Sequence, residues 1–92
     1  MKSRAHIFVR GVVQGVYYRD FTRSHATAME LTGWVRNVSD GRVEIVVEGE
    51  REKIDHLVER LRSGSPSSRV DDVQVSQESY LGEFTGFQIR YH

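Results

Sequence analysis

Asp40-Gly41 restricts the fold more than any other feature of the sequence, because it lies between two β-rich runs, 33–38 and 42–48. An Asp-Gly pair in this position is a strong signal for a hairpin with a tight turn. Apolar residues occupy every second position from Val43 to Val47, which gives the second run one face suited to a core. The sequence therefore predicts two adjacent antiparallel strands.

Helix-like patterns flank this hairpin. Segment 50–62 carries apolar residues at positions i, i+3, i+4 and i+7, the stripe of an amphipathic helix. A shorter pattern at helical spacing predicts another helix over 20–29. Further strands are expected near 4–13, 70–75 and 87–91. The residues that carry the two helical patterns are Ile54, Leu57, Val58 and Leu61, and Thr22, Ala26 and Met29.

The order strand, helix, hairpin, helix, strand indicates the βαββαβ ferredoxin-like sandwich. This is an α+β fold in which two helices cover one face of an antiparallel sheet. We expect residues 1–92 to form a single domain, because a chain of this length can bury one two-layer core. Many unrelated activities occur on this fold, so the function has to be argued from a site.

The composition restricts the partners of the chain. Thirteen basic and thirteen acidic residues cancel, so no overall field attracts nucleic acid or an anionic membrane, and we expect neither partner. The absence of cysteine excludes disulfides and thiol catalysis. The four histidines show no metal-ligand spacing, so no metal site is expected. The N-terminal residues resemble neither a signal peptide nor a membrane span, which makes a cytoplasmic location the expectation.

The stretch from Gly11 to Asp20 has the features of an anion-binding loop. It follows a strand pattern, contains glycines that permit positive φ, and ends where a helix is expected to begin. A helix N-terminus adds unpaired N–H groups, and Arg19 adds a planar fork of donors suited to phosphoryl oxygens. Neither a Walker loop nor a Gly-x-Gly-x-x-Gly pattern is present, which favours a small phosphate or carboxylate over a nucleotide. A plain strand, turn and helix start remains an alternative for this stretch.

Three ordered motifs resemble the acylphosphatase family. They are Gly11-Val-Val-Gln-Gly-Val-Tyr-Tyr-Arg19, Gly33-Trp-Val-Arg-Asn37 and Asp40-Gly-Arg-Val-Glu44. The resemblance spans nearly the whole chain, including the tail Gly86-Phe-Gln-Ile-Arg-Tyr91. One departure is Glu30, which stands where relatives often carry a glycine after the first helix.

The resemblance implies hydrolysis of an acyl phosphate to a carboxylate and inorganic phosphate, without a cofactor and by a monomer. It implies that Arg19 binds the substrate and that Asn37 orients the attacking water. Backbone N–H groups of the phosphate-binding loop would hold the phosphoryl oxygens. That loop consists of Gln14, Gly15, Val16, Tyr17, Tyr18 and Arg19.

Three other interpretations are open at this point. The first is a non-catalytic phosphate- or anion-binding ferredoxin-like domain. The second is an RNA-binding module that uses Tyr17 and Tyr18 for base stacking, although the RNP1 pattern is absent. The third is a carbamoyl-phosphate-processing domain like those of hydrogenase-maturation proteins. Glu44 and Glu48 are expected on a solvated strand face and not as an acid–base pair.

Overall fold

The structure, a computed structural model, describes residues 1–91 and confirms the predicted order of elements. Helix α1 begins at Tyr18, two residues before the predicted start. The elements are β1 (Lys2–Val12), α1 (Tyr18–Ala28), β2 (Thr32–Asn37), β3 (Val43–Glu50), α2 (Arg51–Ser63), β4 (Arg69–Glu78) and β5 (Phe87–Arg90). Within the described residues, neither helix is long and apolar enough to cross a membrane.

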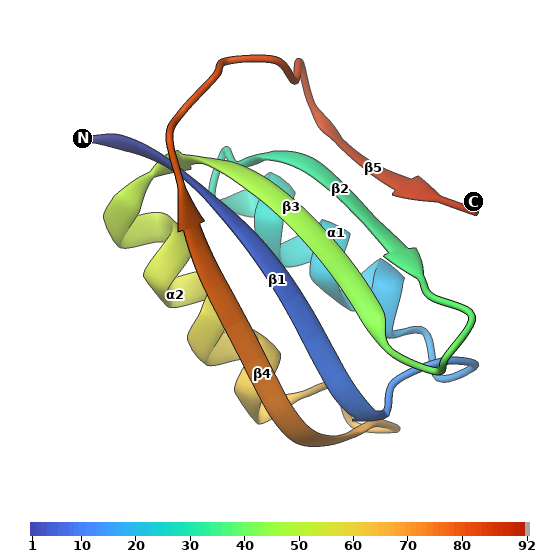
Figure 1. Cartoon of the computed structure of the whole chain (residues 1–92). Helices are drawn as coiled ribbons and strands as arrows, with labels where there is room; N and C mark the ends of the chain where they lie inside the picture. The colour runs from blue at the N-terminus through green and yellow to red at the C-terminus, as the bar shows by residue number, and fades with distance from the viewer. Residues whose placement is uncertain (92) are drawn as a thin grey trace.

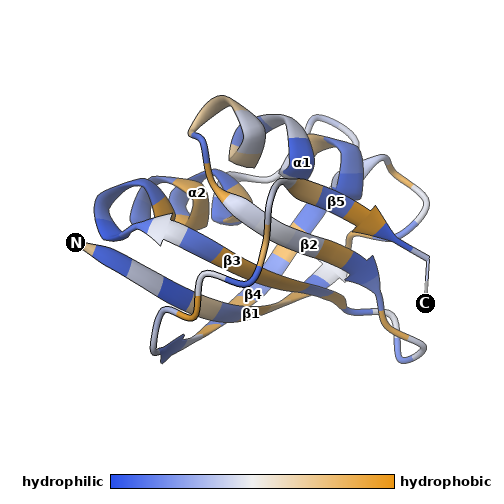
Figure 2. Ribbon diagram, turned by 90° about the horizontal axis from the view of Figure 1, so that it is seen from above, coloured by the Kyte–Doolittle hydropathy of each residue, from blue (hydrophilic) through white to orange (hydrophobic). Residues whose placement is uncertain are grey.

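The five strands form one sheet in the order β4-β1-β3-β2-β5, and both helices lie on the same face of it (Figures 1 and 2). The ferredoxin-like α+β fold is confirmed. Strand β1 pairs antiparallel with β3 and β4, and β2 and β3 form the predicted hairpin. One detail of the prediction was wrong: β5 pairs parallel with β2, so the sheet is mixed. The segment after β4 crosses the end of the sheet before β5 begins (Figure 1). Strand β5 therefore runs in the same direction as its neighbour β2 and not opposite to it.

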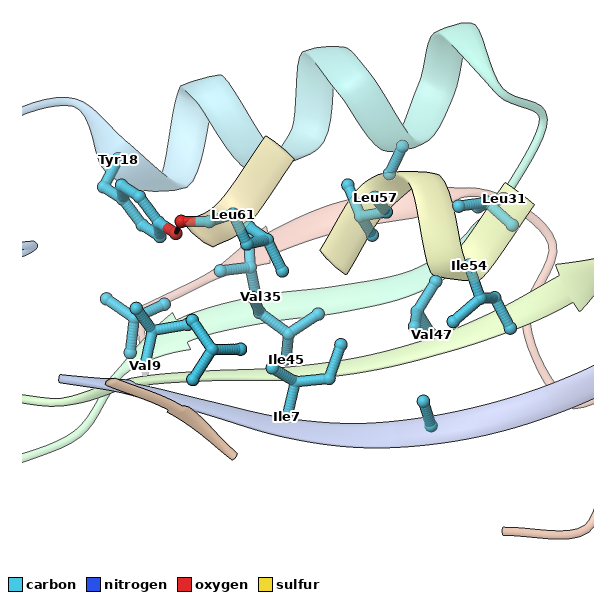
Figure 3. Close-up of a cluster of buried hydrophobic side chains, with 14 of the residues drawn as sticks. Ile7, Val9, Tyr18, Leu31, Val35, Ile45, Val47, Ile54, Leu57 and Leu61 are labelled. Carbon is cyan, nitrogen blue, oxygen red and sulfur yellow. Dashed lines mark hydrogen bonds between the residues drawn. The ribbon is translucent and has the colours of Figure 1, made fainter. Parts of the chain in front are cut away.

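The core lies between the sheet and the two helices (Figure 3). The alternation in β1 and β3 buries Ile7 and Ile45 completely, because these residues point toward the helices. Helix α2 contributes Ile54, Leu57 and Leu61 from its apolar stripe, all fully buried. Burial of such side chains contributes roughly 1.5–3 kcal/mol each. This packing fixes α1, and with it the loop that precedes α1.

Glu44 and Glu48 are buried, which corrects the expectation of a solvated strand face. Glu44 lies 2.5 Å from His6 Nε2 and accepts a hydrogen bond of 2.6 Å from Arg36 Nε. Partners from β1 and β2 therefore cover this carboxylate on the sheet face opposite the helices. Alternation within β3 could not reveal those partners, because they come from other strands.

Glu48 connects β3 to the segment between β4 and β5. Its carboxylate accepts backbone N–H bonds from Leu81 (2.7 Å), Gly82 (3.2 Å) and Glu83 (3.1 Å), and a bond of 3.3 Å from Arg4. Burial alone would raise the pKa of Glu48, but these four donors hold the pKa below its ordinary value. The charged carboxylate thus anchors a segment that has no regular secondary structure of its own.

Candidate active site

The loop between β1 and α1 contains two residues in the left-handed region. Gly15 has φ 74°, and Tyr17, the N-cap of α1, has φ 61°. Positive φ at alternate positions is typical of backbone turns whose N–H groups converge on an anion. Within residues 1–91, the backbone N–H groups of Gly15, Val16 and Tyr17 donate to no other group. The loop therefore offers free donors beside the N-terminus of a helix.

Two of these residues, Gly15 and Tyr17, border a concavity of about 310 Å³. Its walls are formed by the end of β1, the loop and the first turn of α1, and include Gly15, Tyr17 and Arg19. Asp20 also lines it, so the site carries one acidic group beside the arginine. The volume suits a phosphoryl group with water around it better than a nucleotide.

Gln14 has a different role from the other loop residues. Its side-chain amide donates to the carbonyl oxygens of Val38 (2.7 Å) and Arg42 (2.9 Å) in the β2–β3 hairpin. It does not line the concavity. The side chain of Gln14 therefore fixes the loop to the hairpin and faces away from the proposed anion.

Tyr18 anchors the start of α1 in the core (Figure 3). Its hydroxyl donates a hydrogen bond of 2.8 Å to the carbonyl oxygen of Leu61 at the end of α2. Burial raises the pKa of Tyr18 above its ordinary value, so this hydroxyl stays a donor at neutral pH. Val16, which is partly buried, also packs against the core. These two side chains hold the loop against the core, while the backbone N–H groups of residues 15–17 make no hydrogen bond within residues 1–91.

Arg19 is half-buried at the first turn of α1, and the C-terminal strand positions it. Its Nη1 lies 3.4 Å from the carbonyl oxygen of Arg90, and its guanidinium lies 4.9 Å from the centre of the Tyr91 ring. Among residues 1–91, no carboxylate forms an ion pair with Arg19. Its charge is therefore not neutralised within that range. No sequence pattern predicted these two contacts, because they depend on the parallel pairing of β5 with β2.

Asn37 ends β2 and lies beside the segments that hold the loop. Its neighbour Arg36 pairs with Arg90, the residue whose carbonyl faces Arg19, and its other neighbour Val38 accepts a bond from Gln14. The Oδ1 atom of Asn37 is buried and has no hydrogen-bond partner in residues 1–91. Asn37 does not line the 310 Å³ concavity itself. An unsatisfied acceptor of this kind is unusual in a folded protein and fits a site that holds a water.

A larger concavity, of about 580 Å³, lies at the end of β1 and the β2–β3 turn. Two of its arginines already have carboxylate partners: Arg42 bonds Asp40 at 2.8 Å, and Arg69 bonds Asp71 at 3.0 Å. An incoming anion would compete with these internal pairs. The third arginine, Arg10, has no ion pair among residues 1–91, but this concavity does not lie at a helix N-terminus. The smaller concavity, which combines Arg19 with the loop before α1, is therefore the better candidate for an anion site.

The fold and the site together define a ferredoxin-like α+β protein with a loop of free backbone N–H groups and an arginine at a helix N-terminus. A model of the acylphosphatase family matches residues 5–89. A curated relative, the acylphosphatase of Pelotomaculum thermopropionicum (strain DSM 13744 / JCM 10971 / SI), is 49% identical over 90 residues, which cover 98% of each chain. The chain belongs to the acylphosphatase family.

Solved structures agree with this assignment. The crystal structure of acylphosphatase from Bacillus subtilis is 41% identical, with a TM-score of 0.93, and the match covers 99% of this chain and 100% of that chain. A crystal structure of full-length HypF, in a phosphate- and nucleotide-bound form, matches with 29% identity and a TM-score of 0.85. This second match covers 98% of this chain and 12% of that chain.

Proposed function

We propose that the protein hydrolyses acyl phosphates at the loop before α1. The observation that carries this proposal is the combination of free backbone N–H groups and an arginine without a carboxylate partner among the described residues. Family membership and the acylphosphatase relatives support an enzyme over the non-catalytic anion-binding alternative. The substrate class is a small-molecule acyl phosphate, and the product that remains in the loop is inorganic phosphate.

The N–H groups of the loop and the fork of Arg19 hold the phosphoryl oxygens. Asn37 Oδ1 accepts a hydrogen bond from a water and directs the water oxygen toward phosphorus, opposite the acyl oxygen. The new P–O bond forms as the acyl P–O bond breaks, and the carboxylate leaves with the bonding electron pair. Both protons of the water end on the phosphate. The leaving group is good, so positioning and charge stabilisation supply most of the rate enhancement.

The proposal also covers the domain organisation, oligomeric state, location and partners of the protein. Residues 1–92 act as a single catalytic domain, monomeric and cytoplasmic, which binds no nucleic acid. Equal numbers of basic and acidic residues support the last point, because sequence-independent nucleic-acid binding needs an excess of positive charge.

Hydrolysis of benzoyl phosphate, measured with a metal chelator present, tests the proposal. We expect wild type to be active and Arg19→Lys to lose about 100-fold or more in kcat/KM, because lysine has a single ammonium in place of the planar fork. Arg23→Lys is the matched control, since Arg23 lies on the same helix with only a weak contact of 3.9 Å to Asp20. Activity of folded Arg19→Lys close to wild type would contradict the role of Arg19. Inactive folded wild type would favour the anion-binding alternative.

A further inference from the structure

We propose that a groove beside the anion concavity binds the acyl group of the substrate and selects acyl phosphates whose acyl group is uncharged and carries an apolar chain or an aromatic ring. This inference rests on the function proposed above. The groove has a volume of about 290 Å³ and lies between the start of α1 and the connection from α2 to β4. Both segments lie at the same end of the molecule (Figure 1).

The walls of the groove are mostly apolar. Val16 and Phe21 form its inner side, and both pack against the core. Tyr17 and Pro66 form its outer walls. A shallow apolar groove of this size has room for a short alkyl chain or one ring, and it stabilises such a group by removing apolar surface from water.

The groove is continuous with the anion concavity, because Tyr17 and Asp20 line both. A phosphoryl group held by the loop would therefore present its acyl substituent at the entrance of the groove. Tyr17 and Asp20 form the border between the two sites. The two concavities together match the two chemical parts of an acyl phosphate.

Tyr17 has a conformation that packing does not explain. It adopts φ 61° although it is not glycine, and it is 81% exposed. Its side chain also forms no cap for α1. A left-handed non-glycine residue costs about 1 kcal/mol, and such residues concentrate at functional sites. Contact with the acyl group in the groove explains why an exposed position of this loop carries an aromatic ring.

Asp20 makes the groove selective by charge. It is exposed at the border of the groove, and its ion-pair partner Arg23 is 3.9 Å away. In the anion concavity, Arg19 and the free N–H groups offset the charge of Asp20, but Arg19 does not line the groove. An acyl group with its own carboxylate would therefore be repelled in the groove, because like charges disfavour close approach. The substrate class is therefore an acyl phosphate with an uncharged acyl group.

A series of acetyl, butyryl and hexanoyl phosphate tests the groove. The three carboxylate leaving groups have similar basicity, so differences in kcat/KM report on contacts of the chain. Each fully buried methylene raises kcat/KM about fourfold. In an open groove we expect roughly half of the corresponding free energy, which is about twofold for each methylene. The hexanoyl to acetyl ratio of kcat/KM should therefore be on the order of tenfold in wild type. The kcat/KM for butyryl phosphate should also exceed that for succinyl phosphate, which has the same chain length with a carboxylate in place of the terminal methyl.

Two variants change the groove in opposite directions. Tyr17→Gly removes the ring and accepts the positive φ, and it should bring the hexanoyl to acetyl ratio close to one. Ser24→Leu adds apolar surface at an exposed lining position of α1 and should raise the ratio two- to threefold, on the scale of one to two methylenes. Thr27→Leu, exposed on the same helix outside the groove, should leave the ratio unchanged. An effect of a variant on binding of the phosphoryl group changes kcat/KM for both substrates equally, so it cancels in the hexanoyl to acetyl ratio.

A ratio near one in active wild type would overturn the assignment of the groove and leave the proposed function intact. A ratio that is the same in wild type, Tyr17→Gly and Ser24→Leu would do so as well. If folded wild type hydrolyses none of the three compounds, the proposed function fails, and this inference fails with it.

Discussion

Glu30 occupies a left-handed position directly after α1, with φ 60°. The N–H of Glu30 bonds to the carbonyl of Thr27 at 3.0 Å, and the N–H of Leu31 bonds to that of Ala26 at 2.9 Å. This pair of bonds is a Schellman motif, in which glycine is the preferred residue at the left-handed position. The backbone geometry thus favours glycine here, as the resemblance to the family suggested. Glu30 adopts this left-handed conformation with steric strain.

We predict that Glu30→Gly raises the free energy of unfolding by about 0.5–1 kcal/mol, because glycine adopts this φ without a steric penalty. The substitution also removes the contact of 3.2 Å between Glu30 and Lys53, but exposed ion pairs contribute little. Urea denaturation measures the change, and Lys53→Met serves as a control for the lost ion pair. A lower stability of Glu30→Gly than of Lys53→Met would contradict the strain argument.

Asn37 has a buried side-chain oxygen without a hydrogen-bond partner among residues 1–91. We expect Asn37→Ala to lower kcat by about 10- to 100-fold, the scale of a misplaced reactant, with inhibition by inorganic phosphate changed less than about threefold. The reason is that Oδ1 has no partner among residues 1–91 and is assigned to the water, while phosphate is held by the loop. Steady-state kinetics with phosphate as inhibitor separates the two effects. Equal losses in turnover and in phosphate affinity would assign Asn37 to phosphate binding.

At the scale of elements, the Glu48 carboxylate holds the connection between β4 and β5 to the sheet. We predict that Glu48→Gln lowers the free energy of unfolding at pH 7 by about 1–3 kcal/mol, because an amide lacks the charge and its NH₂ group faces backbone donors.

The difference between wild type and Glu48→Gln should shrink in acid. The folded-state pKa of Glu48 is below its ordinary value of 4.5, so its charge stabilises the fold above that pH. This contribution is lost as the pH falls through the folded-state pKa. Denaturation between pH 7 and pH 3 measures the effect, with exposed Glu59→Gln on α2 as the control. A difference that stays constant over this range would show that the charge of Glu48 is unimportant.

Across the protein, the sequence was sufficient to predict the features that are encoded within one segment. The hairpin at Asp40-Gly41, the stripe of α2 and the order of elements are local patterns, and the structure confirms them. The motifs also pointed to the family, which the comparisons show. The roles of Arg19 and Asn37 stay predictions.

Features that depend on contacts between distant segments could not be predicted from patterns. The parallel direction of β5 and the burial of Glu48 both depend on where the segment after β4 crosses the sheet. The tether from Gln14 to the hairpin and the contact of Arg19 with Arg90 are of the same kind. Each joins residues far apart in the sequence, where periodicity carries no information.

The position of β1 inside the sheet also has a consequence for how the protein forms. Ile7 pairs with Ile45 on one side and with Val75 on the other, so β1 gains its second neighbour only after most of the preceding chain has been synthesised. Pairing across such long separations requires the loss of much chain entropy before contacts form, and this slows folding. Until β4 emerges during synthesis, one edge of β1 keeps unpaired N–H and C=O groups, and such an edge can pair with another chain and promote aggregation.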